Sequence, residues 1–324
     1  MCSFYCVRMQ IYSFSVFVIC EKMYLWVLSG SDFKDLCYMR WIITVLAIGA
    51  MLFTAGCASE VVDKEFVVYD CLGYPGKPDL STDGLSRLKL VYESRLLSDG
   101  RIDLEKINAC IAEANEAGIK TISTDIESWY WDESYSNESL KDSLAVIFDV
   151  FRKGIEGVSV GNYGIPLGTL NIARYVEEMA GKTDEELMEV LTGSSNRLAA
   201  GEVSDVLYPC FYCYGPEIDQ WVEDLKITVD YIKKYYPDKK IVGYLWSQYY
   251  DWKTSPYYMQ FITEEKYLQM LEAAYECLDG VVLWAHGRDA DNKTKVSWED
   301  ERVQAIYRAI KTFTSRHSIT NQHQ

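Results

Sequence analysis

A closed α/β barrel of parallel strands and amphipathic helices is the fold that this sequence predicts. From residue 66 onward, short apolar segments alternate with helical patterns, which is the order of repeated βα units. These units occupy about 250 residues, the usual size of a TIM-type (β/α) barrel. No Gly-x-Gly-x-x-Gly motif follows the first strand, which argues against a dinucleotide-binding sheet. We therefore predict one domain over residues 66–315, a seven-stranded TIM-type barrel.

The predicted strands are short, apolar and rich in β-branched or aromatic residues. They cover 66–70, 88–92, 121–127, 158–163, 205–212, 241–246 and 281–285. Between the strands, apolar residues recur with helical spacing. The predicted helices cover 103–117, 137–153, 184–199, 217–235, 263–278 and 299–314. We expect the polar tail at 316–324 to be frayed.

The beginning of the chain predicts export to the cell envelope. An apolar stretch from Trp41 to Gly56 follows Arg40 and ends in Thr54-Ala-Gly-Cys57, which resembles a bacterial lipoprotein signal peptide. Cys57 would then be the lipidated first residue of the mature protein. A transmembrane anchor is the alternative, but this stretch has 16 residues, whereas a span needs about 20.

This interpretation divides the first 65 residues into three parts. We expect residues 1–38 to be an extension that arises from a start site assigned too early, with Met39 as the true start. Residues 39–57 would be the signal peptide and 58–65 a short linker. The mature protein would be lipid-anchored in a bacterial cell envelope, at the outer membrane or facing the periplasm.

Charge and cysteine content narrow the classes of function. The formal net charge of −16 disfavours binding to nucleic acid. Five cysteines follow Cys57, an odd number that predicts no complete disulfide framework. Cys210-Phe-Tyr-Cys213 has redox-like spacing but lies in a predicted strand, not at a helix start. Because His286 is the one histidine inside the domain, we predict no metal site and no cofactor.

Two carboxylates stand two residues apart at the end of a predicted strand. Side chains at i and i+2 point to the same face of a strand, so Asp125 and Glu127 would project together, with Trp129 ahead of them. Like charges this close cannot both ionise easily, which raises one pKa and leaves a protonated acid near neutral pH. Glycoside cleavage needs such an acid. The alternative is an ordinary surface pair at a strand end.

Aromatic side chains fall at the ends of other predicted strands, where barrels of this type carry their catalytic groups. Tyr208 and Tyr212 share one strand face, Tyr244 and Trp246 share another, and Trp284 precedes His286 on a third. Such rings form a floor for sugars, whose C–H faces are apolar and whose hydroxyls need polar partners. An aromatic-rich barrel core is the alternative explanation.

Taken together, these segments resemble the hyaluronidase family, glycoside hydrolase family 56. Asp125-Ile-Glu127-Ser-Trp129 matches the family's Asp-x-Glu-x-Trp acid motif, and Leu207-Tyr-Pro-Cys-Phe-Tyr212 is similar to its Leu-aromatic-Pro-Ser-x-Tyr strand. Leu88-Lys-Leu-Val-Tyr92 resembles the family's second strand, and Leu278-Asp-Gly-Val-Val-Leu-Trp284 its last. The resemblance follows the same order over roughly residues 66–314.

The resemblance implies a retaining, substrate-assisted mechanism, in which the 2-acetamido oxygen of the sugar attacks its own anomeric carbon. It assigns the acid/base role to Glu127, the orientation of the acetamido group to Asp125, and a hydrogen bond to that group to Tyr212. The candidate substrate-binding residues are Trp129, Tyr208, Tyr244, Trp246, Trp284 and Asp70.

Two departures from the family pattern affect the expected substrate. The usual Arg-Pro after the acid motif is replaced by Tyr130-Trp131, and Asp132 and Glu133 follow, which would repel uronate carboxylates. We therefore expect hydrolysis of N-acetylhexosamine-containing glycans, possibly neutral ones. The alternatives are a conventional two-carboxylate glycosidase, which would use Glu127 with a partner such as Asp70, and a non-catalytic surface lipoprotein that binds glycans.

Overall fold

The computed structural model describes residues 64–130, 136–168, 170–174, 179, 181–193, 197–250, 253 and 255–320. Residues 65–324 form one compact unit. The predicted extension, the signal peptide and Cys57 lie outside the described residues, as do Trp131, Asp132 and Glu133.

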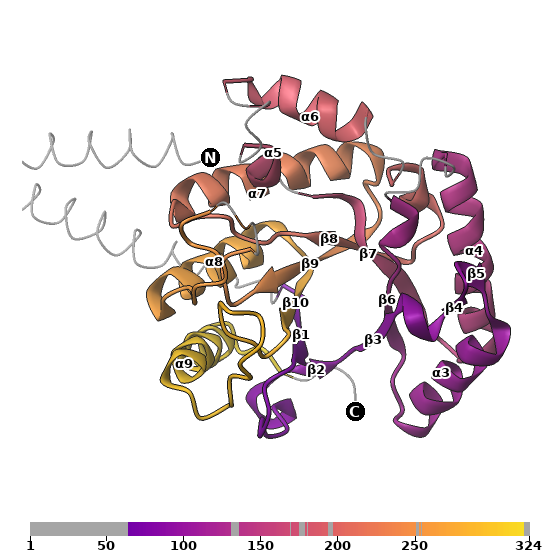
Figure 1. Ribbon diagram of the computed structural model, residues 1–324, viewed down its shortest axis with the longest axis horizontal. Coiled ribbons are helices and arrows are strands. Elements are labelled where there is room, and N and C mark those ends of the chain that lie inside the picture. The colour runs from indigo at the N-terminus through magenta and orange to yellow at the C-terminus, as the bar shows by residue number, and fades with distance from the viewer. Residues whose placement is uncertain are drawn as a thin grey trace, which may run out of the picture. The chain divides into compact units, whose positions relative to one another are not determined.

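A parallel sheet of eight strands, in the order β2-β1-β10-β9-β8-β7-β6-β3, forms the centre of the unit (Figure 1). Each recorded strand pair in it is parallel. The strands are β1 (Val67–Leu72), β2 (Ser86–Arg87), β3 (Lys89–Tyr92), β6 (Thr121–Asp125), β7 (Ser159–Gly168), β8 (Val206–Cys210), β9 (Lys240–Trp246) and β10 (Gly280–Ala285). A small antiparallel ribbon of β4 (Leu97–Ser98) and β5 (Arg101–Ile102) stands apart from this sheet.

The predicted TIM-type fold is confirmed, but the described sheet has eight strands and not the predicted seven. The additional strand arises because the segment predicted at 88–92 starts earlier and is interrupted at Leu88. Before this residue β2 pairs with β1 (Tyr69↔Ser86), and after it β3 pairs with β6 (Tyr92↔Asp125). One short segment therefore contacts both β1 and β6, which brings the two ends of the sheet together.

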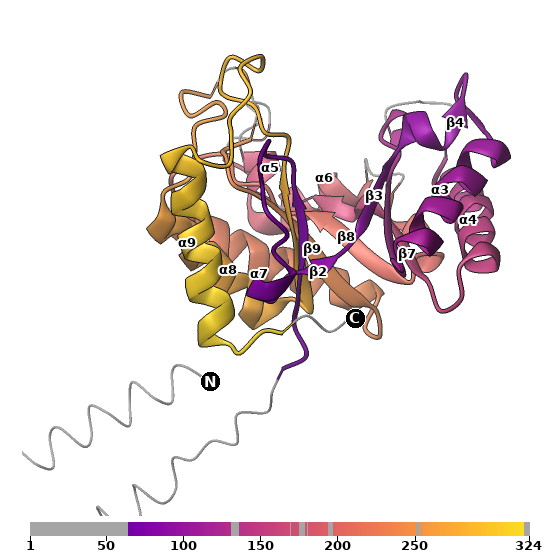
Figure 2. The ribbon, with the colours of Figure 1, turned by 90° about the horizontal axis from the view of Figure 1, so that it is seen from below.

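The helices lie outside the strands, α7, α8 and α9 on one side and α3 and α4 on the other (Figures 1 and 2). They are α3 (Leu104–Glu116), α4 (Asn137–Gly154), α5 (Leu170–Arg174), α6 (Asp184–Gly193), α7 (Ile218–Tyr235), α8 (Glu264–Cys277) and α9 (Glu301–Arg316). Short 3₁₀ helices are η2 (Ser81–Asp83), η3 (Glu93–Arg95), η4 (Ser128–Tyr130) and η6 (Ala199–Glu202). In the described part of the chain, no helix combines the length and the apolar character that crossing a membrane requires.

Side-chain caps determine where several of these helices begin. Asp103 accepts hydrogen bonds from two main-chain N–H groups at the start of α3, and Ser136 forms a capping box with Ser139 at the start of α4. Thr263 and Asp300 cap α8 and α9 in the same way. Each cap satisfies N–H groups that have no partner within the helix, typically worth about 1 kcal/mol.

Tyrosine rings fill the interior of the barrel below its open end. The Tyr208 and Tyr244 rings lie edge to face at 6.1 Å, and the Tyr244 hydroxyl donates to Ser123 Oγ at 2.7 Å. Gly161 leaves room for this packing, because a Cβ there would lie 2.2 Å from the Val206 carbonyl oxygen. The interior is therefore a packed core and not a channel, as is usual for this fold.

Candidate active site

A cavity of about 160 Å³ opens at the carboxyl ends of the strands. Parallel strands all end on this side of a barrel, so side chains from distant parts of the sequence meet there. The cavity is lined by Leu90, Asp125, Glu127, Tyr163, Tyr212, Tyr244, Trp246, Tyr250, Trp284 and His286. The structure thus brings together six residues that the sequence predicted for the site: Asp125, Glu127, Tyr212, Tyr244, Trp246 and Trp284.

The two carboxylates share the cavity but differ in exposure. Strand β6 ends at Asp125, two residues earlier than predicted, and Glu127 lies in the turn that follows. Glu127 is exposed, whereas Asp125 is half-buried and its Oδ1 atom is fully buried. Burial, the negative charges of Glu127 and Glu93, and a hydrogen bond with Glu127 together raise the pKa of Asp125 to about 7, with burial the largest cause. This pair therefore keeps a proton near neutral pH.

A buried amide fixes the main chain of the acid motif. Asn162 of β7 accepts hydrogen bonds at Oδ1 from Thr124 Oγ1 (2.6 Å) and from the main-chain N–H of Ile126 (3.3 Å). Its Nδ2 group donates to the Tyr130 hydroxyl and to the Tyr163 carbonyl oxygen. Because the side chain is only 1% exposed and fully engaged, it holds the peptide between the two carboxylates in place.

The wall of the cavity beside the acid pair includes a cluster of aromatic rings. The Tyr212 ring stacks on Trp284 at 5.8 Å with an interplanar angle of 23°, and it meets Trp246 edge to face at 5.5 Å. Tyr250 lies 5.8 Å from Tyr212 on another side. Rings held by one another in this way present a rigid apolar surface of the kind that the C–H face of a sugar contacts.

Two of the described residues that line the cavity carry a buried polar atom without a hydrogen-bond partner. Among the described residues, neither Asp125 Oδ1 nor Trp246 Nε1 has a hydrogen-bond partner, although both atoms are buried. His286 accepts the main-chain N–H of Arg288 at Nδ1 (3.1 Å), so in a neutral ring the proton lies on Nε2. Buried polar atoms without partners are costly, and a polar ligand would satisfy them.

Three predicted binding residues do not line the cavity. Tyr208 is fully buried below it, and Trp129 is only 3% exposed. Asp70 forms an ion pair with Lys77 and accepts the main-chain N–H of Leu72 at 3.1 Å. The neighbouring Tyr69 is hydrogen-bonded to Thr121 of β6, so Asp70 belongs to the opposite face of β1.

Sequence reasoning missed Tyr163, Tyr250 and Leu90 as cavity residues, and His286 was named only as a neighbour of Trp284. Tyr163 was detectable, because it is the last residue of a predicted strand and so stands at the catalytic end. Leu90 carried no chemical signal. Tyr250 follows β9 by four residues, and only the fold of the loop brings it to the cavity; its main-chain N–H donates to the Cys213 carbonyl oxygen at 2.7 Å.

The cysteines next to the cavity are free thiols of low reactivity. Cys210 Sγ accepts a hydrogen bond from the Tyr163 hydroxyl at 3.2 Å, and Cys213 Sγ donates to the Gly215 carbonyl oxygen at 2.9 Å. Burial raises the pKa of both thiols to about 12. Thiolates are the reactive form, so neither residue is a nucleophile at neutral pH.

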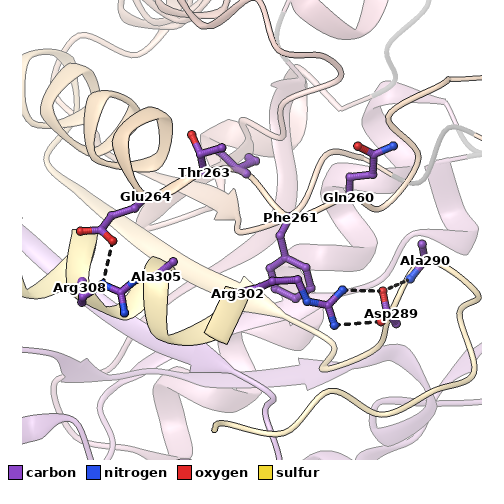
Figure 3. A pocket seen from close by; sticks show the side chains of 10 residues that line it. Gln260, Phe261, Thr263, Glu264, Asp289, Ala290, Arg302, Ala305 and Arg308 are labelled. Carbon is purple, nitrogen blue, oxygen red and sulfur yellow. Dashed lines mark hydrogen bonds and ion pairs between the residues drawn. The ribbon is translucent and has the colours of Figure 1, made fainter. Parts of the chain in front are cut away.

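A larger hollow of about 690 Å³ lies at the amino ends of α8 and α9, and Figure 3 shows its side chains. Arg302 is bound by Asp289 on two oxygens and lies 4.8 Å over the ring of Phe261. Arg308 pairs with Glu264 at 2.8 Å. The first ion pair joins a loop to α9, and the second joins α8 to α9. In the described residues, no group of three or more His, Cys, Asp or Glu side chains could hold a metal ion.

No protein-family model and no curated protein matches the sequence. Solved structures similar to the chain include bee venom hyaluronidase in complex with a hyaluronic acid tetramer, with 13% identity, 80% of this chain and 99% of that chain covered, and a TM-score of 0.49. A β-mannanase from Streptomyces thermolilacinus has 14% identity, coverage of 80% and 91%, and a TM-score of 0.41. A GH18 chitinase from Pseudoalteromonas aurantia has 11% identity, with 70% of this chain and 77% of that chain covered, and a TM-score of 0.34.

We predict that Asp125→Asn stabilises the protein increasingly as pH rises from about 4 to 7. The folded state holds the Asp125 proton more tightly than the unfolded state, so wild-type stability falls as pH rises through this window. The shift from 3.8 to about 7 corresponds, at about 1.4 kcal/mol per pKa unit, to a gain on the order of 4 kcal/mol for the variant. Urea unfolding at several pH values measures it.

The matched control is Asp142→Asn, which changes an exposed aspartate on α4. Its effect on the free energy of unfolding should not vary over the same pH range. A gain for Asp125→Asn that is equally independent of pH would contradict a raised pKa in the folded protein.

Proposed function

We propose that this protein is a glycoside hydrolase that cleaves N-acetylhexosamine-containing glycans with retention, by substrate assistance. The observation that carries the proposal is the acid pair, half-buried Asp125 beside exposed Glu127, at a cavity walled by aromatic rings. Among the described lining residues, these two are the only carboxylates, and one segment carries both. A conventional retaining site needs two carboxylates about 5 Å apart on opposite sides of the sugar.

In the proposed reaction, Glu127 donates a proton to the glycosidic oxygen, and the bond from C1 to that oxygen breaks with its electron pair leaving on the oxygen. The carbonyl oxygen of the 2-acetamido group bonds to C1 and forms an oxazolinium ion. In the reacting state the one proton of the hydrogen-bonded pair is on Glu127, so Asp125 is ionised, accepts a hydrogen bond from the acetamido N–H and stabilises the positive charge of the oxazolinium ion. Water then attacks C1 and gives its proton to Glu127, while the bond from C1 to the acetamido oxygen breaks and its electron pair returns to that oxygen. This step restores the acid, the acetamido group and the original configuration.

Tyr212 would bind the acetamido group, while Trp246 and Trp284 would support the sugar ring. The Tyr212 hydroxyl stays protonated because burial raises its pKa well above the ordinary value, so it remains a hydrogen-bond donor. The two-carboxylate alternative loses its proposed partner, since Asp70 is paired with Lys77 away from the cavity. A pure glycan-binding protein would have no use for a protonated acid, which favours an enzyme.

We predict that Glu127→Gln lowers turnover of a glycan with an unactivated leaving group by about 10²–10⁴-fold, because the variant cannot donate the proton. A panel of neutral and acidic N-acetylhexosamine glycans, digested by the purified protein, first identifies the substrate. Glu116→Gln, at an exposed position that ends α3, is the control and should keep the wild-type rate. Retention of more than about a tenth of that rate by Glu127→Gln would show that another residue is the acid.

We predict that a thiazoline mimic of the bridged intermediate inhibits the wild-type protein, since an enzyme binds species close to its transition state more tightly than its substrate. Asp125→Asn should weaken this inhibition together with turnover. Mass spectrometry of protein quenched during turnover checks the alternative. A glycosyl ester trapped on an aspartate or glutamate would establish a covalent nucleophile and exclude substrate assistance.

We further propose that the protein is exported and anchored by a lipid on Cys57, which the signal-like segment before this residue supports. In a bacterial host, Cys57→Ala should move the protein from the membrane fraction to the soluble fraction without changing its turnover. Intact mass measurement identifies the mature first residue. Recovery of peptides from residues 1–38 in the mature protein would contradict the assigned start at Met39.

A further inference from the structure

The carboxylate of Glu93 reaches the main chain immediately after Glu127. Glu93 follows β3 and begins η3, and its Oε2 accepts the main-chain N–H of Ser128 at 3.2 Å. This peptide lies beyond the end of β6 at Asp125, where the ladder between β3 and β6 has stopped. A side chain from the neighbouring segment therefore supplies the acceptor that a strand would otherwise provide.

Glu127 is thus held on both sides of its position in the chain. The preceding N–H, of Ile126, is bound by Asn162 of β7, and the following N–H, of Ser128, is bound by Glu93. One holding side chain belongs to β7 and the other to the residue that follows β3, so the two segments that flank β6 each contribute one. Fixing the main chain in this way limits where the Glu127 carboxyl can move, and small displacements of a catalytic group are costly.

Glu93 also adds a negative charge beside the acid pair. Burial is the main cause of the raised pKa of Asp125, followed by the charges of Glu127 and Glu93. Other groups that act electrostatically with Asp125 are neutral hydroxyls, because burial raises their pKa values: Tyr92, Tyr130, Tyr212 and Tyr244. One of these hydroxyl groups, that of Tyr130, belongs to a ring that the guanidinium of Arg197 covers at 4.9 Å.

We propose that Glu93 is a positioning residue of this site, which fixes the main chain that carries Glu127 and places a third negative charge next to Asp125. The part of this proposal that concerns catalysis rests on the proposed function. The hydrogen bond from Ser128 to Glu93 and the effect of the Glu93 charge on Asp125 do not rest on it, because both are measurable without a substrate.

Three variants separate the two effects. Glu93→Gln removes the charge but keeps a side-chain oxygen that can accept the Ser128 N–H. Glu93→Ala removes both. Glu116→Gln removes one charge from the end of α3, which precedes β6 and so lies at the other end of the barrel. For each variant, NMR would follow the titration of the Asp125 carboxyl carbon and the hydrogen exchange of the Ser128 amide.

In Glu93→Gln, we expect the Asp125 pKa to fall by about half a unit to one unit while the Ser128 amide stays protected. In Glu93→Ala, the pKa should fall similarly and the amide should exchange at least about 10-fold faster. Glu116→Gln should change neither. An Asp125 pKa that is unchanged in both Glu93 variants, or a Ser128 amide that exchanges equally in all of them, would overturn the proposal.

With a glycan substrate, Glu93→Gln should move the loss of kcat at high pH downward by the same fraction of a unit, because the acid pair loses its proton earlier. Glu93→Ala should lower kcat by about a further 10-fold, with KM changed less. If no glycan is cleaved but the NMR results are as expected, the proposed function fails and the role of Glu93 in the geometry and charge of the acid pair stands.

Discussion

The parallel pairing of β6 with β3 and β7 is the interaction on which the candidate active site depends. The register sets Tyr92 beside Asp125 and Asn162 beside Thr124, so the segments that follow Tyr92 and flank Asn162 reach the acid motif from its two sides. Hydrogen bonds continue past the end of the ladder through the side chains of Asn162 and Glu93. The same strand pairing that builds the barrel therefore also determines where the Glu127 carboxyl lies.

The raised pKa of Asp125 keeps a proton in the acid pair near neutral pH, and it also lowers the stability of the fold there. A carboxyl buried near two other carboxylates costs folding free energy whenever the solution pH favours its ionised form. The tightly packed interior tolerates this cost because its tyrosine rings bury a large apolar area and bind one another or a hydroxyl such as that of Ser123. A site that is unfavourable by itself is supported by the core beneath it.

Local patterns predicted most of the elements, because strands and helices follow the periodicity of apolar residues. The predicted helix at 217–235 and the observed α7 (Ile218–Tyr235) differ by one residue. The division at Leu88 was not predictable in this way, since both halves of the segment have strand character and only pairing with different neighbours separates them. The short α5 was missed as well, although Arg174 at its end pairs with the buried Asp224 of α7 at 2.9 Å.

The sequence by itself predicted that Asp125 and Glu127 lie together, and both line the cavity, although Glu127 lies in the turn after β6 and not on a strand face. Only the tertiary structure decided which of them is buried, and it placed the raised pKa on Asp125. It also decided that Asp70 pairs with Lys77 and that Trp129 is covered. The physical reason is that alternation gives relative orientation alone, whereas burial and charge depend on neighbours brought from distant strands by the closed barrel.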